Sequence, residues 1–155
     1  MGVNVSFNKS AEALPFFKAA IAANSKIGRF WTSYIDALVK ENQLEEAEVS
    51  CRKAIELEPN LVKTHYNLGL VISKLGRLEE AEAIYKKAIE LEPDNSELYY
   101  NLALTLQNSG KLEKSRTIYK KALKLDSSDK RIKIGYGRLL LKLNEKIKGL
   151  KILSE

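Results

Sequence analysis

Hydrophobic positions recur along this chain with the spacing of amphipathic helices, separated by short polar breaks. One apolar stripe, with i, i+3, i+4, i+7 spacing, consists of Trp31, Tyr34, Ile35 and Leu38. A second stripe follows at Leu44, Ala47, Cys51, Ala54 and Leu57. The break between them is Asn42-Gln43, and asparagine suits the left-handed conformation that closes a helix. The pattern therefore predicts two antiparallel helices of about 12 to 14 residues joined by a tight turn.

This two-helix pattern recurs with a period of 34 residues. The sequence LEEAE at 44–48 is repeated at 78–82, and KAIELEP at 53–59 is repeated at 87–93. A more divergent third copy has GKLE at 110–113, where the second has GRLE at 76–79. One helix pair cannot bury its apolar face alone, so the copies predict an all-α solenoid of stacked pairs.

The period divides the chain into repeats with partial units at both ends. Repeat one is 28–61, repeat two 62–95 and repeat three 96–129, while 130–155 is a partial fourth repeat or a pair of capping helices. Pro59 and Pro93 stand at the same position of repeats one and two, and we call such a shared position a column. Each proline should end a helix one or two residues earlier. Residues 11–27 should hold the second helix of a preceding unit, with Pro15 in its first turn, after a disordered start at 1–10.

The repeated columns resemble the tetratricopeptide (TPR) signature, with an aromatic residue, Leu-Gly, Ala, an aromatic residue, Ala and Pro at fixed positions. Repeat two matches it through Leu68-Gly69, Ala81, Tyr85, Ala88 and Pro93, with His65 in place of the usual tryptophan. Repeat one keeps Trp31 but has Cys51 in the second aromatic column, and repeat three has Ser115 and Ser127 for Ala and Pro. The resemblance covers 28–129 and implies a right-handed α-solenoid that binds protein segments in its concave groove.

Charge is distributed unevenly along the chain, whose net charge is +6. Residues 130–155 contain eight basic and two acidic side chains, whereas repeat one contains four basic and seven acidic ones. We interpret the basic end chiefly as a solvated helix face, with an acidic partner as the alternative. Nucleic acid is disfavoured as a partner because exposed aromatic residues do not alternate with the Lys and Arg.

Candidate catalytic residues are scarce. His65 is the single histidine and Cys51 the single cysteine, and both fall in columns expected to be buried. The chain shows no metal-ligand spacing and no phosphate-binding glycine loop, so we expect no metal, no cofactor and no enzymatic activity. The lone cysteine excludes an internal disulfide, and no apolar run is long enough to span a bilayer, so we expect a cytoplasmic protein without membrane contact.

The binding residues that the TPR resemblance implies lie on the first helix of each repeat. Those we expect to contact an extended peptide are Lys63, Tyr66, Asn67, Leu70, Tyr100, Asn101, Leu104 and Arg138. Tyr66 and Tyr100 are equivalent, with Asn67 and Asn101 beside them, so rings could pack peptide side chains while amides bond its backbone. A structural role for these Tyr and Asn residues is the alternative.

The clamp with which some TPR proteins hold a C-terminal carboxylate is incomplete in this chain. Asn67 fits its middle position, but Thr32 and Asp36 stand where Lys and Asn are required. Glu97 and Asn101 likewise replace the required Lys and Arg. The sequence therefore argues against a clamp for chaperone C-termini.

The last helix carries apolar residues in surface columns. Ile147 and Leu150 occupy positions that hold mostly Glu in the three repeats. They could form a homodimer contact or dock a following domain. Alternatively, a loop one residue longer would shift Ile147 into a core column.

The sequence thus predicts a right-handed α-solenoid of about three and a half TPR-like units that acts as a protein-binding scaffold. An alternative from another class is that it is the recruiting segment of a larger enzyme, a transferase or oxygenase, whose chemistry lies outside this chain. The sequence identifies neither the ligand nor the oligomeric state.

Overall fold

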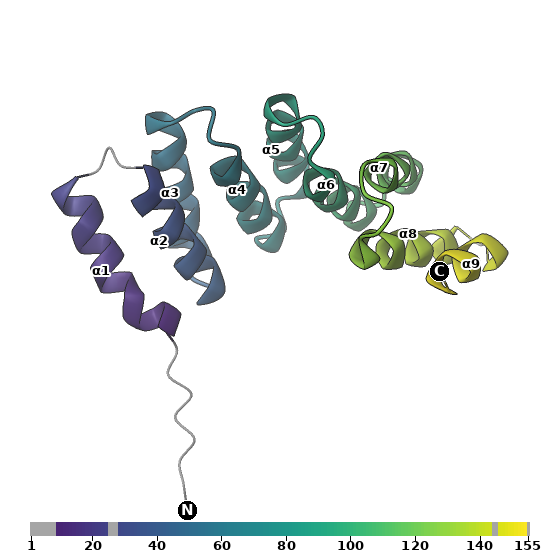
Figure 1. The fold of residues 1–155 in the computed structure, drawn as a ribbon, viewed down its shortest axis with the longest axis horizontal. Helices are drawn as coiled ribbons and strands as arrows, with labels where there is room; N and C mark the ends of the chain where they lie inside the picture. Colours follow the sequence, from purple (N-terminus) through teal and green to yellow (C-terminus); the bar gives the residue numbers. More distant parts are fainter. Residues whose placement is uncertain (1–8, 25–27, 144–145, 155) are drawn as a thin grey trace, which may run out of the picture. The chain divides into compact units, whose positions relative to one another are not determined.

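A computed structural model of the chain describes residues 9–24, 28–143 and 146–154. All regular structure in these ranges is helical, and the helices are α1 (Lys9–Ala23), α2 (Gly28–Lys40), α3 (Leu44–Leu57), α4 (Val62–Lys74), α5 (Leu78–Leu91), α6 (Ser96–Asn108), α7 (Leu112–Leu125), α8 (Lys130–Lys142) and α9 (Lys146–Ser154) (Figure 1). The all-α prediction is therefore confirmed. The chain forms two compact units, an N-terminal unit of residues 1–71 and a C-terminal unit of residues 72–155, with the boundary inside α4.

The helices repeat the 34-residue period of the sequence. First helices α2, α4, α6 and α8 begin at 28, 62, 96 and 130, and each has 13 residues. Second helices α3, α5 and α7 begin at 44, 78 and 112, and each has 14 residues. These lengths confirm the predicted helix pairs.

The turn inside each pair has the same geometry in all three repeats. Asn42, Gly76 and Gly110 adopt φ values of 56°, 79° and 76°, which only glycine and asparagine adopt readily. The following N–H reaches back to a helix carbonyl, as Arg77 N does to Ile72 O at 3.1 Å. This is the Schellman closure, and it satisfies carbonyls that the helix end would otherwise leave unpaired.

The predicted helix ends before proline are confirmed, and the predicted helix within 11–27 is present, but α1 begins earlier than expected. Helices α3 and α5 end at Leu57 and Leu91, two residues before Pro59 and Pro93. Helix α1 begins at Lys9, so it includes part of the stretch expected to be disordered, and Pro15 lies inside the helix and not in its first turn. Ala11 and Pro15 are exposed, so water can solvate the carbonyl that Pro15 leaves without a donor.

The core of the N-terminal unit lies between the first-helix stripe of repeat one and the small residues of α3. Helix α2 packs on both α1 and α3. Tyr34, Ile35 and Leu38 are at most 4% exposed, and Ala47 and Cys51 are fully buried. The small residues of α3 allow α2 and α3 to pack closely, which is the structural role of these columns.

The core of the C-terminal unit contains a cluster of tyrosines and aliphatic side chains. Its buried members are Tyr99, Ala103, Tyr119, Ala122, Ile132, Tyr136, Leu139 and Leu140. The ring centroids of Tyr119 and Tyr136 are 5.9 Å apart in a stacked arrangement. Ser115, which replaces the alanine of the repeat, is fully buried and donates a hydrogen bond to Ala103 O at 2.7 Å. The hydroxyl is therefore tolerated in a small-residue column because its hydrogen bond is satisfied.

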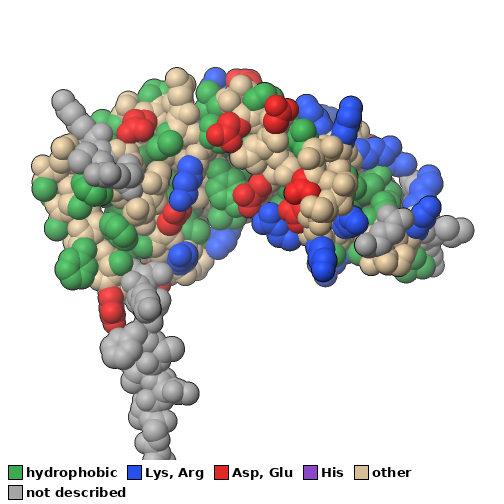
Figure 2. Space-filling view, in the orientation of Figure 1, with side chains coloured by type: hydrophobic (Ala, Val, Ile, Leu, Met, Phe, Trp, Pro, Cys, Tyr) green, Lys and Arg blue, Asp and Glu red, His purple; other side chains and the backbone are tan. Residues whose placement is uncertain are grey.

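Charged side chains on the C-terminal unit are unevenly placed, and Lys and Arg gather over α7, α8 and α9 (Figure 2). One acidic side chain in this unit is buried: Glu82 accepts bonds from Lys111 Nζ at 2.8 Å and Lys86 Nζ at 2.6 Å. These two ammonium groups, Lys111 first, hold the pKa of Glu82 below its ordinary value. The ion pair with Lys111 connects two successive repeats, since Glu82 lies in α5 and Lys111 precedes α7.

Helix α9 begins at Lys146, 34 residues after the first residue of α7. Ile152, which corresponds to Ile118 in this register, packs against the tyrosine cluster, so the described part of α9 follows the period without an inserted residue. Leu150 is 61% exposed, whereas the side chain of Ile147 lies outside the described residues. A homodimer or domain contact at this end stays a prediction.

Candidate functional site

The N-terminal unit holds a polar group that spans two first helices. Asp36 lies in α2, and Lys63 and Asn67 lie on adjacent turns of α4. Asn67 Nδ2 donates to Asp36 Oδ1 at 2.8 Å, and Lys63 Nζ donates to Asp36 Oδ2. Asn67 is 4% exposed, so its amide depends on this bond, whereas Lys63 is open to solvent. Asp36 therefore accepts hydrogen bonds from Lys63 and Asn67, two side chains that we expected to donate to a bound peptide.

Replacement of Asp36 by alanine is expected to lower the free energy of unfolding by about 1–3 kcal/mol, because the buried Asn67 amide loses its acceptor. The matched control is Lys63→Ala, which removes the exposed partner of the same carboxylate and should cost less than about 1 kcal/mol. Urea unfolding followed by circular dichroism measures both variants. Equal losses would show that the buried amide has no special dependence on Asp36.

The C-terminal unit brings an aromatic ring, a leucine and an arginine together on α6 and α8. Tyr100 and Leu104 are half-buried and pack against the tyrosine cluster. Arg131 lies with its Cζ 5.7 Å from the centroid of the Tyr100 ring and bonds Glu97 at 3.1 Å and Asp129 at 2.8 Å. The ring of Tyr100 meets that of Tyr119 edge-on, at 6.4 Å between centroids. We call Tyr100, Asn101, Leu104, Arg131 and Arg138 the first-helix face of this unit.

The amide of Asn101 is also engaged within the protein. Its Nδ2 donates to Glu97 O, one turn earlier in α6, at 2.9 Å. The amide carbonyl and the second N–H add further hydrogen-bonding capacity at the first-helix face. Arg138 is exposed on α8, so its guanidinium is accessible to a ligand.

The predicted binding residues fall into two groups that the structure describes separately. Lys63, Tyr66, Asn67 and Leu70 belong to the N-terminal unit, where Tyr66 and Leu70 are half-buried. Tyr100, Asn101, Leu104 and Arg138 belong to the C-terminal unit. Sequence reasoning did not identify the roles of Asp36 and Arg131, because each depends on a contact between helices rather than on the residue's own column.

His65 and Cys51 lie in the packed interior, as expected. His65 is 7% exposed, and its Nε2 lies 2.7 Å from Pro59 O. Tyr99, in the same column of the next repeat, donates from its hydroxyl to Pro93 O at 2.9 Å. His65 therefore supplies the bond that tyrosine supplies elsewhere. Burial raises the pKa of the Cys51 thiol to about 12, which keeps it protonated and unreactive at neutral pH.

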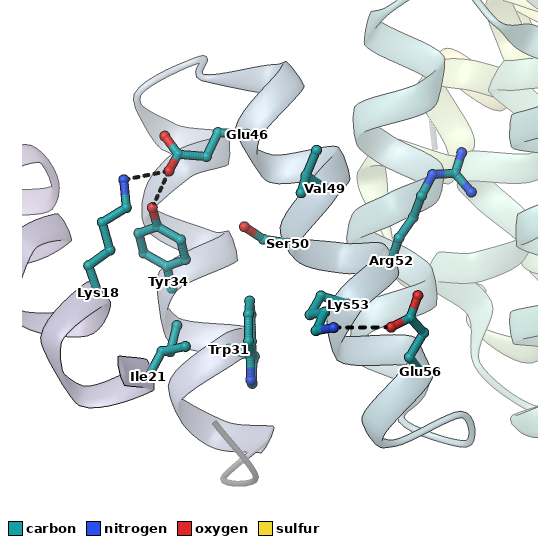
Figure 3. Close-up of a pocket in the computed structure, with 10 residues that line it drawn as sticks. All are labelled: Lys18, Ile21, Trp31, Tyr34, Glu46, Val49, Ser50, Arg52, Lys53 and Glu56. Carbon is teal, nitrogen blue, oxygen red and sulfur yellow. Dashed lines mark hydrogen bonds and ion pairs between the residues drawn. The ribbon is translucent and has the colours of Figure 1, made fainter. Parts of the chain in front are cut away.

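A cavity that the sequence did not indicate lies in the N-terminal unit. It measures about 560 Å³ and lies among α1, α2 and α3, with Trp31, Tyr34 and Ile21 along its wall (Figure 3). Lys18 and Glu46 form an ion pair of 2.7 Å at one end of it, and Tyr34 donates to the same carboxylate oxygen at 2.6 Å. Lys18, followed by Tyr34, holds the pKa of Glu46 below its ordinary value, so this carboxylate is ionised at neutral pH.

In the part of the chain that the structure describes, no group of three or more His, Cys, Asp or Glu side chains is arranged to hold a metal ion. Over the same ranges, no helix combines the length and the hydrophobicity needed to cross a membrane.

Comparison with known proteins links the chain to repeat proteins. The E3 ubiquitin-protein ligase CHIP of Arabidopsis thaliana is 37% identical over 60 residues, which are 39% of this chain and 22% of that protein. The structure resembles MamA (residues 41 to the end) from Desulfovibrio magneticus RS-1, with a TM-score of 0.86 and 20% identity over 94% of this chain and 82% of that one. It also resembles YrrB, with a TM-score of 0.74 and 23% identity over 88% and 70% of the two chains.

Family models confirm what the columns indicated. Models described as tetratricopeptide repeat match residues 62–95 and 84–117, and one described as TPR repeat matches 36–76. The match over 62–95 coincides with repeat two, which consists of α4 and α5. The chain belongs to the tetratricopeptide-repeat family.

Proposed function

We propose that the chain is a non-catalytic scaffold in the cytoplasm that binds an extended segment of another protein on its first helices. In the C-terminal unit that segment lies across α6 and α8, on the first-helix face. Lys63, Tyr66 and Leu70 offer a separate set of contacts within the N-terminal unit. The TPR fold fits such a scaffold, and YrrB, a protein of similar fold, is described as having an unusual peptide-binding site.

The observation that carries the proposal is the arrangement of Tyr100, Leu104 and Arg131. The half-buried side chains of Tyr100 and Leu104 pack against the tyrosine cluster, and the Arg131 guanidinium lies over the Tyr100 ring while bonded to Glu97 and Asp129. Apolar contacts of this kind anchor a bound peptide, and polar neighbours fix its orientation. A ligand with an apolar side chain beside an acidic one suits this surface, because the Arg138 guanidinium is exposed there.

Selection from a random-peptide display library tests the proposal. Peptides enriched on the native protein should lose at least about tenfold in affinity for a Tyr100→Ala, Leu104→Ala variant, since each apolar anchor contributes 1 kcal/mol or more. The matched control is Ala83→Ser with Thr117→Ala, on the exposed faces of α5 and α7. Circular dichroism must show that both variants remain helical. Retained affinity in the first variant would contradict the proposal.

The second candidate is a recruiting segment of a larger enzyme. Its support is the similarity to CHIP, an E3 ubiquitin-protein ligase of which the matched part is 22%. In that case the helices described above bind the client, and the chemistry lies elsewhere. The native length of the protein in its cell, measured by mass spectrometry, distinguishes the two candidates.

A further inference from the structure

The cavity in the N-terminal unit arises from a substitution in the repeat pattern. At the position of Ser50, repeats two and three hold Ile84 and Ile118, and Ile118 packs against the tyrosine cluster of its unit. Ser50 is buried beside the half-buried Trp31, so the volume of an isoleucine side chain is missing there.

Trp31 is more exposed than the aromatic residue at the same position of repeat three. Tyr99, the equivalent of Trp31 two repeats later, is 2% exposed, and the Lys121 ammonium lies 4.6 Å from its ring centroid. Trp31 is half-buried and lines the cavity (Figure 3), and Val49, which also lines it, is 69% exposed. Protein interiors are normally close-packed, and sites for small molecules typically measure about 300–1,000 Å³.

An ion pair lies at each end of the cavity, Lys18 with Glu46 and Lys53 with Glu56. Lys18 and Lys53 approach it from α1 and α3, each with three N–H groups. Glu46 already accepts bonds from Lys18 and Tyr34 on one oxygen, and Glu56 lies 3.5 Å from Lys53. Arg52 is a third cation in the lining, and it bonds Glu48 at 2.8 Å. Each lysine retains N–H groups beyond the one in its ion pair, and these can donate to a ligand that brings acceptor oxygens.

We propose that this cavity binds a small apolar organic anion, an aromatic or branched aliphatic molecule with one carboxylate or sulfonate group. The apolar body lies against Trp31 and Ile21 in the space left by Ser50. The anionic group lies at the rim, where Lys18 or Lys53 donates to it. This site is separate from the first-helix face, so its failure would leave the proposed function untouched.

The probe is 8-anilinonaphthalene-1-sulfonate, an aromatic anion of this class. Trp31 is the only tryptophan in the chain, so all tryptophan emission comes from the wall of the cavity. The native protein should show saturable quenching of that emission by the probe at micromolar concentration. Absence of saturable quenching would overturn the proposal.

Ser50→Ile should fill the cavity as the other repeats do. The affinity for the probe should fall at least about tenfold, while Tm rises by about 2–4 °C because an internal void is filled. The matched control, Thr117→Ile, adds a similar side chain to an exposed position of α7 and should leave quenching unchanged. Unchanged quenching in Ser50→Ile would place the probe elsewhere and overturn the proposal.

A second variant and a second probe keep the test decisive if Ser50→Ile fails to fold. Val49→Glu changes an exposed side chain at the mouth and adds negative charge, so it should weaken binding of the anionic probe at least about tenfold. N-phenyl-1-naphthylamine, which is similar but uncharged, should bind the native protein several-fold more weakly than the sulfonate. Equal or tighter binding of the uncharged probe would overturn the assignment of an anion.

Discussion

Replacing Tyr119 by alanine is expected to lower the free energy of unfolding by about 3–5 kcal/mol, the cost of emptying a fully buried aromatic site. Tyr119 is 0% exposed and contacts the rings of both Tyr100 and Tyr136. Removing it would therefore leave the centre of the C-terminal unit without one of its largest side chains. Guanidinium unfolding monitored by circular dichroism gives the value, and a loss below about 1 kcal/mol would contradict the packing described here.

Tyr119→Phe should have the opposite sign. The Tyr119 hydroxyl is buried and has no hydrogen-bond partner among the described residues, and burial raises its pKa. Removing an unpaired buried hydroxyl should stabilise the protein by about 1 kcal/mol. Tyr99→Phe is the matched control, because that hydroxyl bonds Pro93 O at 2.9 Å and its loss should cost about 1 kcal/mol. Destabilisation by both changes would mean that the Tyr119 hydroxyl is paired.

Gly135→Ala is expected to cost about 1–3 kcal/mol, although alanine is normally the better helix former. A Cβ at this position would lie 2.6 Å from Tyr119 Oη and 2.9 Å from its Cε1. The ring is fully buried and cannot move aside without disturbing its neighbours. Thermal unfolding measures the loss, with Lys120→Ala as an exposed alanine control on α7.

The two C-terminal changes should also be coupled. Because Oη is the nearest atom to the added methyl group, Gly135→Ala should cost less in the Tyr119→Phe background than in the native protein. If the effects of Gly135→Ala and Tyr119→Phe on the free energy of unfolding are additive, the added methyl group clashes with an atom other than the Tyr119 hydroxyl.

Much of the fold could be predicted from the sequence because its information is local and repeated. Asn42, Gly76 and Gly110 mark the turns, and Pro59 and Pro93 follow the helix ends. The apolar columns identified the core, including His65 and Cys51. The start of α1 could not be predicted in this way, because a single partial unit lacks a second copy with which to set its register.

The site was less predictable because it depends on what faces each residue across a helix pair. Asn67 was correctly placed on a first helix, but its bond to Asp36 involves a residue 31 positions earlier. The cavity beside Trp31 likewise depends on the side chains that α1 and α3 bring to it. A comparison of columns could have revealed it, because Ser50 is small where Ile84 and Ile118 are large.

The central claim is that the first helices of the repeats bind a protein segment, and chemical-shift mapping with a library-selected peptide tests it most directly. Amide resonances of α6 and α8, at Tyr100, Asn101, Leu104 and Arg131, should shift as the peptide is added. Resonances on the exposed faces of the second helices α5 and α7 should stay in place. Shifts confined to α5 and α7 would contradict the account.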